Sequence, residues 1–158
     1  MAPLADLNDD GRSDVAVGAP GDDDGGTDRG AIYVLFLGLG GTVNSFVKVS
    51  QTNGFAYLAD GDNFGGSLGS LGDFDGDLLA DLIVGANGDN DGGGETGAVW
   101  MLLMNLDGTV KQQQKISALQ GNFTGDLDPL DRFGSSVAAI GDLDDNGKID
   151  VAVGARLD

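Results

Sequence analysis

One acidic motif followed by a short apolar run occurs three times in this chain. It reads DLNDDGRSDVAVGAP from Asp6, DFDGDLLADLIVGAN from Asp73 and DLDDNGKIDVAVGAR from Asp142, so the copies begin 67 and 69 residues apart. The segments between the copies also correspond, as DDDGGTDRGAIYVLFL (Asp22–Leu37) does to DNDGGGETGAVWMLLM (Asp89–Met104). Such a period predicts a repeat architecture, in which each unit buries its apolar faces against its neighbours.

Each repeat is expected to contain four short strands. In the middle repeat they lie near Gly66–Leu71, at Asp81–Gly85, at Gly97–Met104 and near Thr109–Ser117, separated by Gly, Asn and Asp. No segment has a 3.6-residue apolar period of helical length. The pattern predicts an all-β fold of four-stranded antiparallel blades of the β-propeller type. A β-sandwich or a β-solenoid is the alternative architecture.

The composition limits the functions open to the chain. Its 158 residues include 26 acids and 8 bases, for a formal net charge of −18. This charge repels phosphate, so we expect no nucleic-acid partner. No stretch approaches about 18 continuous apolar residues, so we expect no insertion into a membrane. There is no Cys and no His, which removes thiolate chemistry and the commonest general base. No sequence motif of catalysis occurs, and the chain is predicted not to be an enzyme.

The acidic motif has the spacing of a calcium loop, D-x-[DN]-x-[DN]-G-x-x-D. Ca2+ prefers six to eight oxygen ligands, which side chains at positions 1, 3, 5 and 9 and the carbonyl of position 7 can supply. The expected ligands are Asp6, Asn8, Asp10, Arg12 and Asp14 in the first loop, Asp73, Asp75, Asp77, Leu79 and Asp81 in the second, and Asp142, Asp144, Asn146, Lys148 and Asp150 in the third. Up to three structural calcium ions are therefore predicted.

The loops differ at position 6 of the motif. Gly11 and Gly147 occupy it in the first and third loops, whereas Leu78 replaces glycine in the second. A leucine with positive φ is strained, so the second site is expected to be distorted or weaker. An EF-hand is excluded because position 12 is a valine in every copy and not the required Glu. The alternative to a metal site is an Asx turn with solvated carboxylates.

Two further acidic segments, Gly21–Gly30 and Gly88–Gly97, are expected to be solvated loops. Binding of a second cation or of a partner is the alternative for these segments. Trp100 lies in an apolar strand, between Val99 and Met101, and is expected to pack in the core.

An enzyme acting on carbohydrate through paired carboxylates is a distant alternative function, because metal ligation would occupy the aspartates of the loops.

Several of these segments together resemble the FG-GAP repeat, the blade unit of the integrin alpha-chain propeller. They are FGGSLGSLGD, the acidic loop, DLIVGAN and GAVWML. The two signatures of the name are Phe-Gly, at Phe64-Gly65 and Phe133-Gly134, and Gly-Ala-Pro, at Gly18-Ala19-Pro20. The resemblance covers almost the whole chain. It implies a calcium-stabilised extracellular or cell-surface module for adhesion, or for binding a protein or glycan ligand.

The repeat boundaries predict an incomplete propeller of about nine strands within one FG-GAP region, residues 1–158. Residues 1–50 would form a partial blade of strands 2–4, residues 64–117 a full blade, and residues 133–158 a partial blade of strands 1–2. Propellers close with about 4–8 blades. The partners expected are therefore further blades of a parent protein or other copies of the chain. The alternative function is a self-assembling structural unit, forming a ring or a filament.

Overall fold

A computed structural model describes residues 1–156. The described chain is built of strands, with one 3-10 turn, η1 (Leu39–Gly41). The strands are β1 (Ala2–Pro3), β2 (Val15–Ala19), β3 (Ala31–Leu37), β4 (Val43–Ser50), β5 (Phe64–Gly72), β6 (Asp81–Ala86), β7 (Ala98–Met104), β8 (Val110–Ser117), β9 (Ser136–Gly141) and β10 (Asp150–Gly154). Among these residues, no helix has the length and apolar character needed to cross a membrane.

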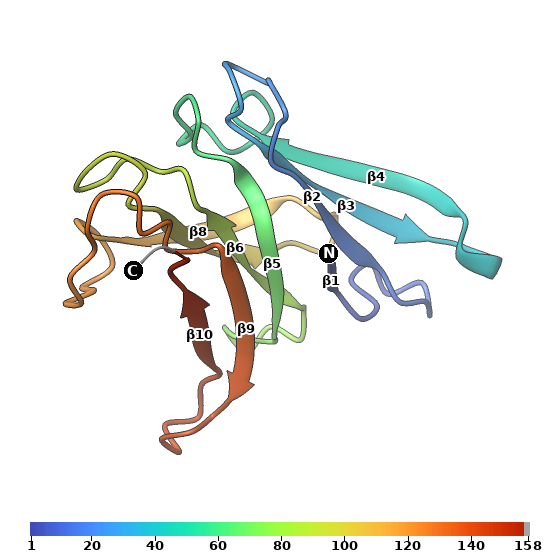
Figure 1. Cartoon of the computed structure of the whole chain (residues 1–158). Coiled ribbons are helices and arrows are strands. Elements are labelled where there is room, and N and C mark those ends of the chain that lie inside the picture. Colours follow the sequence, from blue (N-terminus) through green and yellow to red (C-terminus); the bar gives the residue numbers. More distant parts are fainter. Residues whose placement is uncertain (157–158) are drawn as a thin grey trace.

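The strands form three antiparallel sheets that follow one another along the chain (Figure 1). Two sheets have four strands each, in the orders β1-β2-β3-β4 and β5-β6-β7-β8, and the third is the hairpin β9-β10. Each strand pairs with the next one in sequence, as in a propeller blade. The prediction of an all-β, propeller-type fold is confirmed.

The first sheet contains a strand that the sequence analysis did not predict. Ala2 pairs with Ala16 and Pro3 with Val15, so residues 1–50 form four strands where three were expected. Pro3 has no N–H to donate, and backbone hydrogen bonding continues past it through the Leu4 amide, which donates to the Asp14 carbonyl at 2.9 Å. Leu4 and Leu7, which follow, are fully buried and hold this segment in the core. The described chain therefore has ten strands, and residues 157 and 158 of the expected third blade lie outside it.

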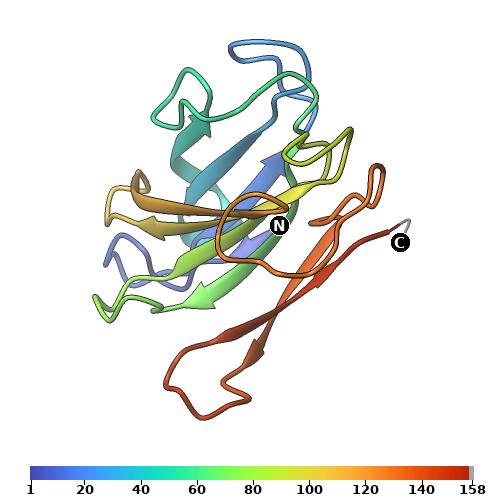
Figure 2. The same ribbon diagram turned by 90° about the vertical axis from the view of Figure 1, so that its left-hand side faces the viewer.

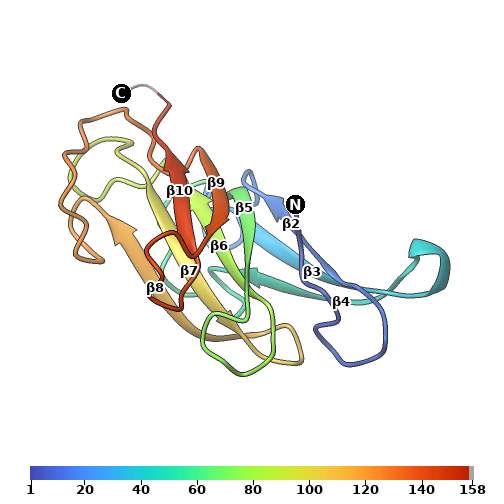
Figure 3. The same cartoon turned by 90° about the horizontal axis from the view of Figure 1, so that it is seen from below.

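The middle sheet is apolar on both faces because it is packed between the other two (Figures 2 and 3). Leu82 and Val84 of β6 belong to the core shared with the first sheet, whereas Ile83 belongs to the core shared with β9 and β10. Successive side chains of a strand point to opposite faces. Every residue of β6 is therefore buried, which accounts for the apolar run that follows Asp81 in this strand.

Trp100 is confirmed as a core residue. It is 5% exposed and lies with its ring centroid 4.9 Å from that of Phe55, which in turn stacks on Phe64 at 4.9 Å. Phe55 comes from the segment joining the first two sheets. The aromatic cluster thus fixes that connection against both sheets.

The two Phe-Gly pairs make the contact between successive sheets. Phe64 forms a parallel bridge with Gly30 of the preceding sheet, and Phe133 forms the same bridge with Gly97. A Cβ added to Gly18 would overlap the carbonyl oxygen of Gly65, and one added to Gly85 would overlap that of Gly134. The glycine of the second strand is therefore required where the Phe-Gly backbone of the next sheet approaches it.

Candidate metal centres

The aspartate at position 9 of each acidic motif fixes the loop to the sheet. Asp81 is fully buried, and its Oδ2 accepts a hydrogen bond from the Phe74 amide at 2.9 Å while Oδ1 accepts one from the Met104 amide at 3.0 Å. Burial raises the pKa of Asp81, and the two amide donors oppose that rise. The bond to Met104 ties the loop between the first two strands to the end of the third.

The first blade repeats this arrangement, and the third contains part of it. Asp14 is fully buried and accepts bonds of 3.0 Å from the amides of Leu7 and Leu37. Asp150 is half-buried and accepts a bond of 2.7 Å from the Leu143 amide. The position-9 acids therefore have a structural role that does not depend on a metal.

The aspartate at position 1 shapes the turn. In the first loop Asp6 accepts bonds from the amides of Asp10 at 2.9 Å and Gly11 at 2.7 Å. Asp142 makes the equivalent bonds in the third loop, to the amides of residues 146 and 147 at 3.0 and 2.8 Å. The first and third loops consequently share one backbone conformation.

Two of the three loops bring carboxylates together closely enough to hold one cation. Ligand oxygens lie within 4.8 Å of one another in two groups: Asp73, Asp75 and Asp81 in the second loop, and Asp142, Asp144 and Asp150 in the third. Oxygens about 2.3–2.6 Å from one Ca2+ can be up to about 5 Å apart, so both groups fit this ion. Their all-oxygen composition also suits a hard cation.

The remaining predicted ligands lie outside these two groups. In the first loop Asn8 stands at position 3, and the carboxylates of that loop form no such group within the described residues. At position 5, Oδ1 of Asp77 and Oδ1 of Asn146 accept bonds from the amides two residues on, at 2.9 and 2.8 Å. These are Asx turns, the alternative that the sequence left open. The donating amides belong to the position-7 residues Leu79 and Lys148, and Arg12 holds position 7 in the first loop.

The second loop has a strained backbone, as its sequence indicates. Leu78 has a φ of 73°, close to the 83° of Gly11 and Gly147 at the same position. The glycine of this loop, Gly76, has instead moved to position 4, where its φ is 90°. Asp9 and Asp145 hold position 4 in the other loops with φ near 58°. Positions 4 and 6 are thus left-handed in all three loops.

A lysine lies on the carboxylates of the second loop. Nζ of Lys111, from β8, is 2.7 Å from Oδ2 of Asp75 and 2.8 Å from Oδ2 of Asp77. The hydrogen bond from Lys111 is the main cause that lowers the pKa of Asp77. The loop therefore already faces one cationic group.

The other two acidic segments are not simply solvated, so that expectation was wrong. Lys115 is 7% exposed, and its Nζ lies 2.6 Å from Asp89 Oδ2 and 2.8 Å from Asp91 Oδ2, over the ring of Trp100. In the first blade Lys48 pairs in the same way with Asp22 and Asp24, at 2.8 and 2.7 Å. The recurrence of a lysine at matching positions of the two repeats was the signal that sequence reasoning missed.

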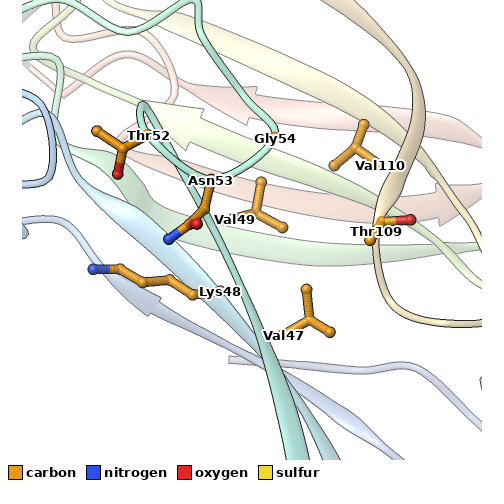
Figure 4. Close-up of a pocket in the computed structure, with 8 residues that line it drawn as sticks. All are labelled: Val47, Lys48, Val49, Thr52, Asn53, Gly54, Thr109 and Val110. Carbon is orange, nitrogen blue, oxygen red and sulfur yellow. The ribbon is translucent and has the colours of Figure 1, made fainter.

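A groove of about 310 Å3 lies between β4 and the turn that joins β7 to β8 (Figure 4). Its lining is mainly aliphatic and small: Val47, Lys48, Val49, Thr52, Asn53, Gly54, Thr109 and Val110. Its charged group, Lys48, is held by Asp22 and Asp24. The groove offers no paired acid and base.

Repeated antiparallel blades, with an acidic loop between the first two strands of each, define a propeller-repeat protein. The family model described as FG-GAP repeat matches residues 2–35 and 64–102. The chain therefore contains FG-GAP repeats over these two segments.

Curated relatives agree with this identification. The chain is 33% identical over 155 residues to integrin alpha-3 of Cricetulus griseus, covering 98% of this chain and 14% of that protein. It is 33% identical to integrin alpha-4 of Xenopus laevis, covering 97% of this chain and 14% of the relative. Integrin alpha pat-2 of Caenorhabditis briggsae is also 33% identical, over 96% of this chain and 13% of the relative. The chain thus spans about one seventh of the length of the curated relatives it matches.

Proposed function

We propose that the chain is a calcium-stabilised, non-catalytic module of an extracellular or cell-surface β-propeller, whose loops present a surface to a protein or glycan ligand. The proposal depends on a cluster of three aspartates that recurs in the loop between the first two strands of successive blades. The two clusters are Asp73, Asp75 and Asp81, then Asp142, Asp144 and Asp150. A single acidic cluster has little weight, but the same donor set in register in two blades supports a common ligand.

A bound Ca2+ would act structurally. Each loop joins the first two strands of a blade, and its last aspartate contacts the third strand or begins the second. An ion held by positions 1, 3 and 9 would cross-link the start and the end of the loop. Millimolar calcium outside cells suffices for loops of modest affinity, which supports an extracellular location.

A non-catalytic role is supported by the state of the acids. The buried aspartates of the loops accept backbone hydrogen bonds, and Asp22, Asp24, Asp89 and Asp91 pair with lysines. Neither arrangement leaves a carboxylate free to act as a general base in a cleft. Adhesion or ligand binding is the role that the integrin resemblance implies.

Thermal unfolding tests the calcium proposal. We expect EDTA to lower the melting temperature by several degrees, because an ion that binds the folded state alone stabilises it. Calcium in excess should restore the loss, and magnesium at equal concentration should restore less. The variant Asp144→Asn should lose part of the response. An unchanged melting temperature after complete chelation would rule out structural calcium.

An assembly role is the second candidate, favoured by an apolar gap beside the β9-β10 hairpin. The gap has a volume of about 330 Å3 and is lined by Val99, Ile116, Phe123, Phe133, Val151 and Val153. Covering such a surface favours association with other copies of the chain or with further blades. Light scattering on the eluting protein tests obligatory assembly, which a folded monomer of 16.0 kDa would refute.

A further inference from the structure

We propose that Lys111 is a built-in competitor for the cation of the second loop, holding Asp75 and Asp77 when calcium is absent and leaving when calcium binds. This inference rests on the calcium function proposed above. It assigns to one side chain the control of calcium affinity in one loop of three.

The ammonium group of Lys111 contacts the carboxylates that a metal ion in this loop would use. One Nζ bridges carboxylates of positions 3 and 5, at 2.7 and 2.8 Å. The Asp75 that it contacts also belongs to the group of oxygens that lie within 4.8 Å of one another. An ammonium and a divalent ion that share the Asp75 carboxylate would lie close together, so they would repel each other strongly. Calcium binding therefore requires Lys111 to move away.

The side chain is free to do so. Lys111 is 42% exposed, and it emerges from an irregular point of the sheet. Val110 pairs with Met104 and Gln112 with Leu103, which leaves Lys111 as the extra residue of a bulge. A bulge redirects a side chain out of the regular pleat. Here it turns the lysine toward the loop, and solvent can receive the ammonium when it leaves.

The first blade provides an internal comparison. It has the same bulge, because Val43 pairs with Leu37 and Ser45 with Phe36, and the extra residue there is Asn44. Asn44 carries no charge, so the loop with Asp6 faces no ammonium from this position. At this bulge the two blades thus differ by one cationic side chain. Within the first loop itself, Arg12 lies 3.3 Å from Asp10.

Two consequences follow for the second loop. Without calcium, Lys111 neutralises part of its charge and should keep it ordered. With calcium, displacing the lysine weakens binding, so the second loop should fill at a higher calcium concentration than the third. Removing the ammonium should raise the calcium affinity of the second loop about tenfold.

The test is a calcium titration of the full chain followed by amide NMR, with Gly76 reporting on the second loop and Gly147 on the third. For Lys111→Asn, which installs the residue of the first blade, we expect the Gly76 midpoint to move about tenfold lower and the Gly147 midpoint to stay unchanged. In EDTA the same variant should melt at a lower temperature than the wild type. Lys111→Arg, which keeps a cation, should titrate like the wild type.

The reciprocal variant Asn44→Lys should weaken calcium binding at the first loop, reported by the Gly11 amide. If Gly147 responds to calcium but Lys111→Asn leaves the Gly76 midpoint unchanged, the competitor role is overturned and the calcium proposal stands. If no loop amide responds to calcium, the calcium proposal fails and the competitor role fails with it.

Discussion

Met104 donates its backbone amide to Oδ1 of Asp81 across 3.0 Å, between residues that are 23 positions apart and both fully buried. The bond joins the last residue of β7 to the first residue of β6. The final aspartate of the acidic motif therefore stabilises the blade and is also a candidate metal ligand.

We therefore expect Asp81→Asn to destabilise the protein even without calcium. An asparagine amide cannot accept on both sides, so one of two buried amides loses its partner, at a cost of about 1–3 kcal/mol. Urea unfolding in EDTA measures this free energy. Asp150→Asn is the matched control, because Asp150 is less buried and accepts one such bond. Equal losses of unfolding free energy in the two variants would contradict this stabilising role of Asp81.

The buried lysine of the middle blade gives a second prediction. Lys115→Met should cost about 3–5 kcal/mol, because it leaves the buried carboxylate of Asp89 without its charged partner. The double variant Lys115→Met/Asp89→Asn should recover part of the loss, as a double-mutant cycle would show. The cost should be the same in calcium and in EDTA. A loss that calcium abolishes would mean that these acids bind metal instead.

The Phe-Gly contact predicts a large effect from one methyl group. Gly65→Ala should cost about 3 kcal/mol or more, because Gly65 has a φ of 91° and its Cβ would overlap the Ala31 carbonyl oxygen of the preceding sheet. Gly72→Ala controls for backbone strain, since its φ is 61° and its Cβ would meet nothing within 4 Å. That control should cost only about 1–2 kcal/mol. Similar values from denaturant unfolding would remove the close approach as the cause.

The strained loop predicts a stabilising substitution. Leu78→Gly should raise the free energy of unfolding by about 0.5–1 kcal/mol, because it relieves the left-handed leucine while adding some unfolded-state entropy. The side chain is 88% exposed, so little packing is lost. Gly147→Leu, which creates the same strain in the third loop, should be destabilising. A loss of stability in Leu78→Gly, measured in EDTA, would contradict this account.

Asp62 predicts a dependence on pH. Burial raises the pKa of Asp62 from 3.8 to about 6. The hydrogen bond of 2.8 Å that its Oδ2 accepts from the Ala59 amide opposes this rise. Between these values the folded state binds more protons than the unfolded state, so stability falls as pH rises from about 4 to 6. Asp62→Asn can keep the Ala59 bond and does not titrate. Its stability relative to the wild type should increase across that window and level off above it, and a constant difference would exclude this role.

Much of the repeat unit could be predicted from the sequence. The alternation of short apolar runs with Gly, Asn and Asp predicted the strands of the middle blade. For β6 the predicted end, Gly85, and the observed end, Ala86, differ by one residue. The two-residue strand β1 was missed because its pairing with β2 depends on burial of Leu4 and Leu7, not on a local pattern. Lys48 and Lys115 were missed because each pairs with acids 24 to 26 residues away in sequence.

The sequence by itself determined the repeat period, the oxygen-rich donor set of each loop and the need for left-handed residues within it. These properties depend on residue type and on neighbours within one turn of backbone. The tertiary structure decided which carboxylates meet, where Phe-Gly docks on the preceding sheet, and that Lys111 contacts one loop while Asn44 occupies the same bulge in the other blade. Those relationships depend on strand register and on the packing of sheets, which join residues too far apart in the chain for any local preference to specify.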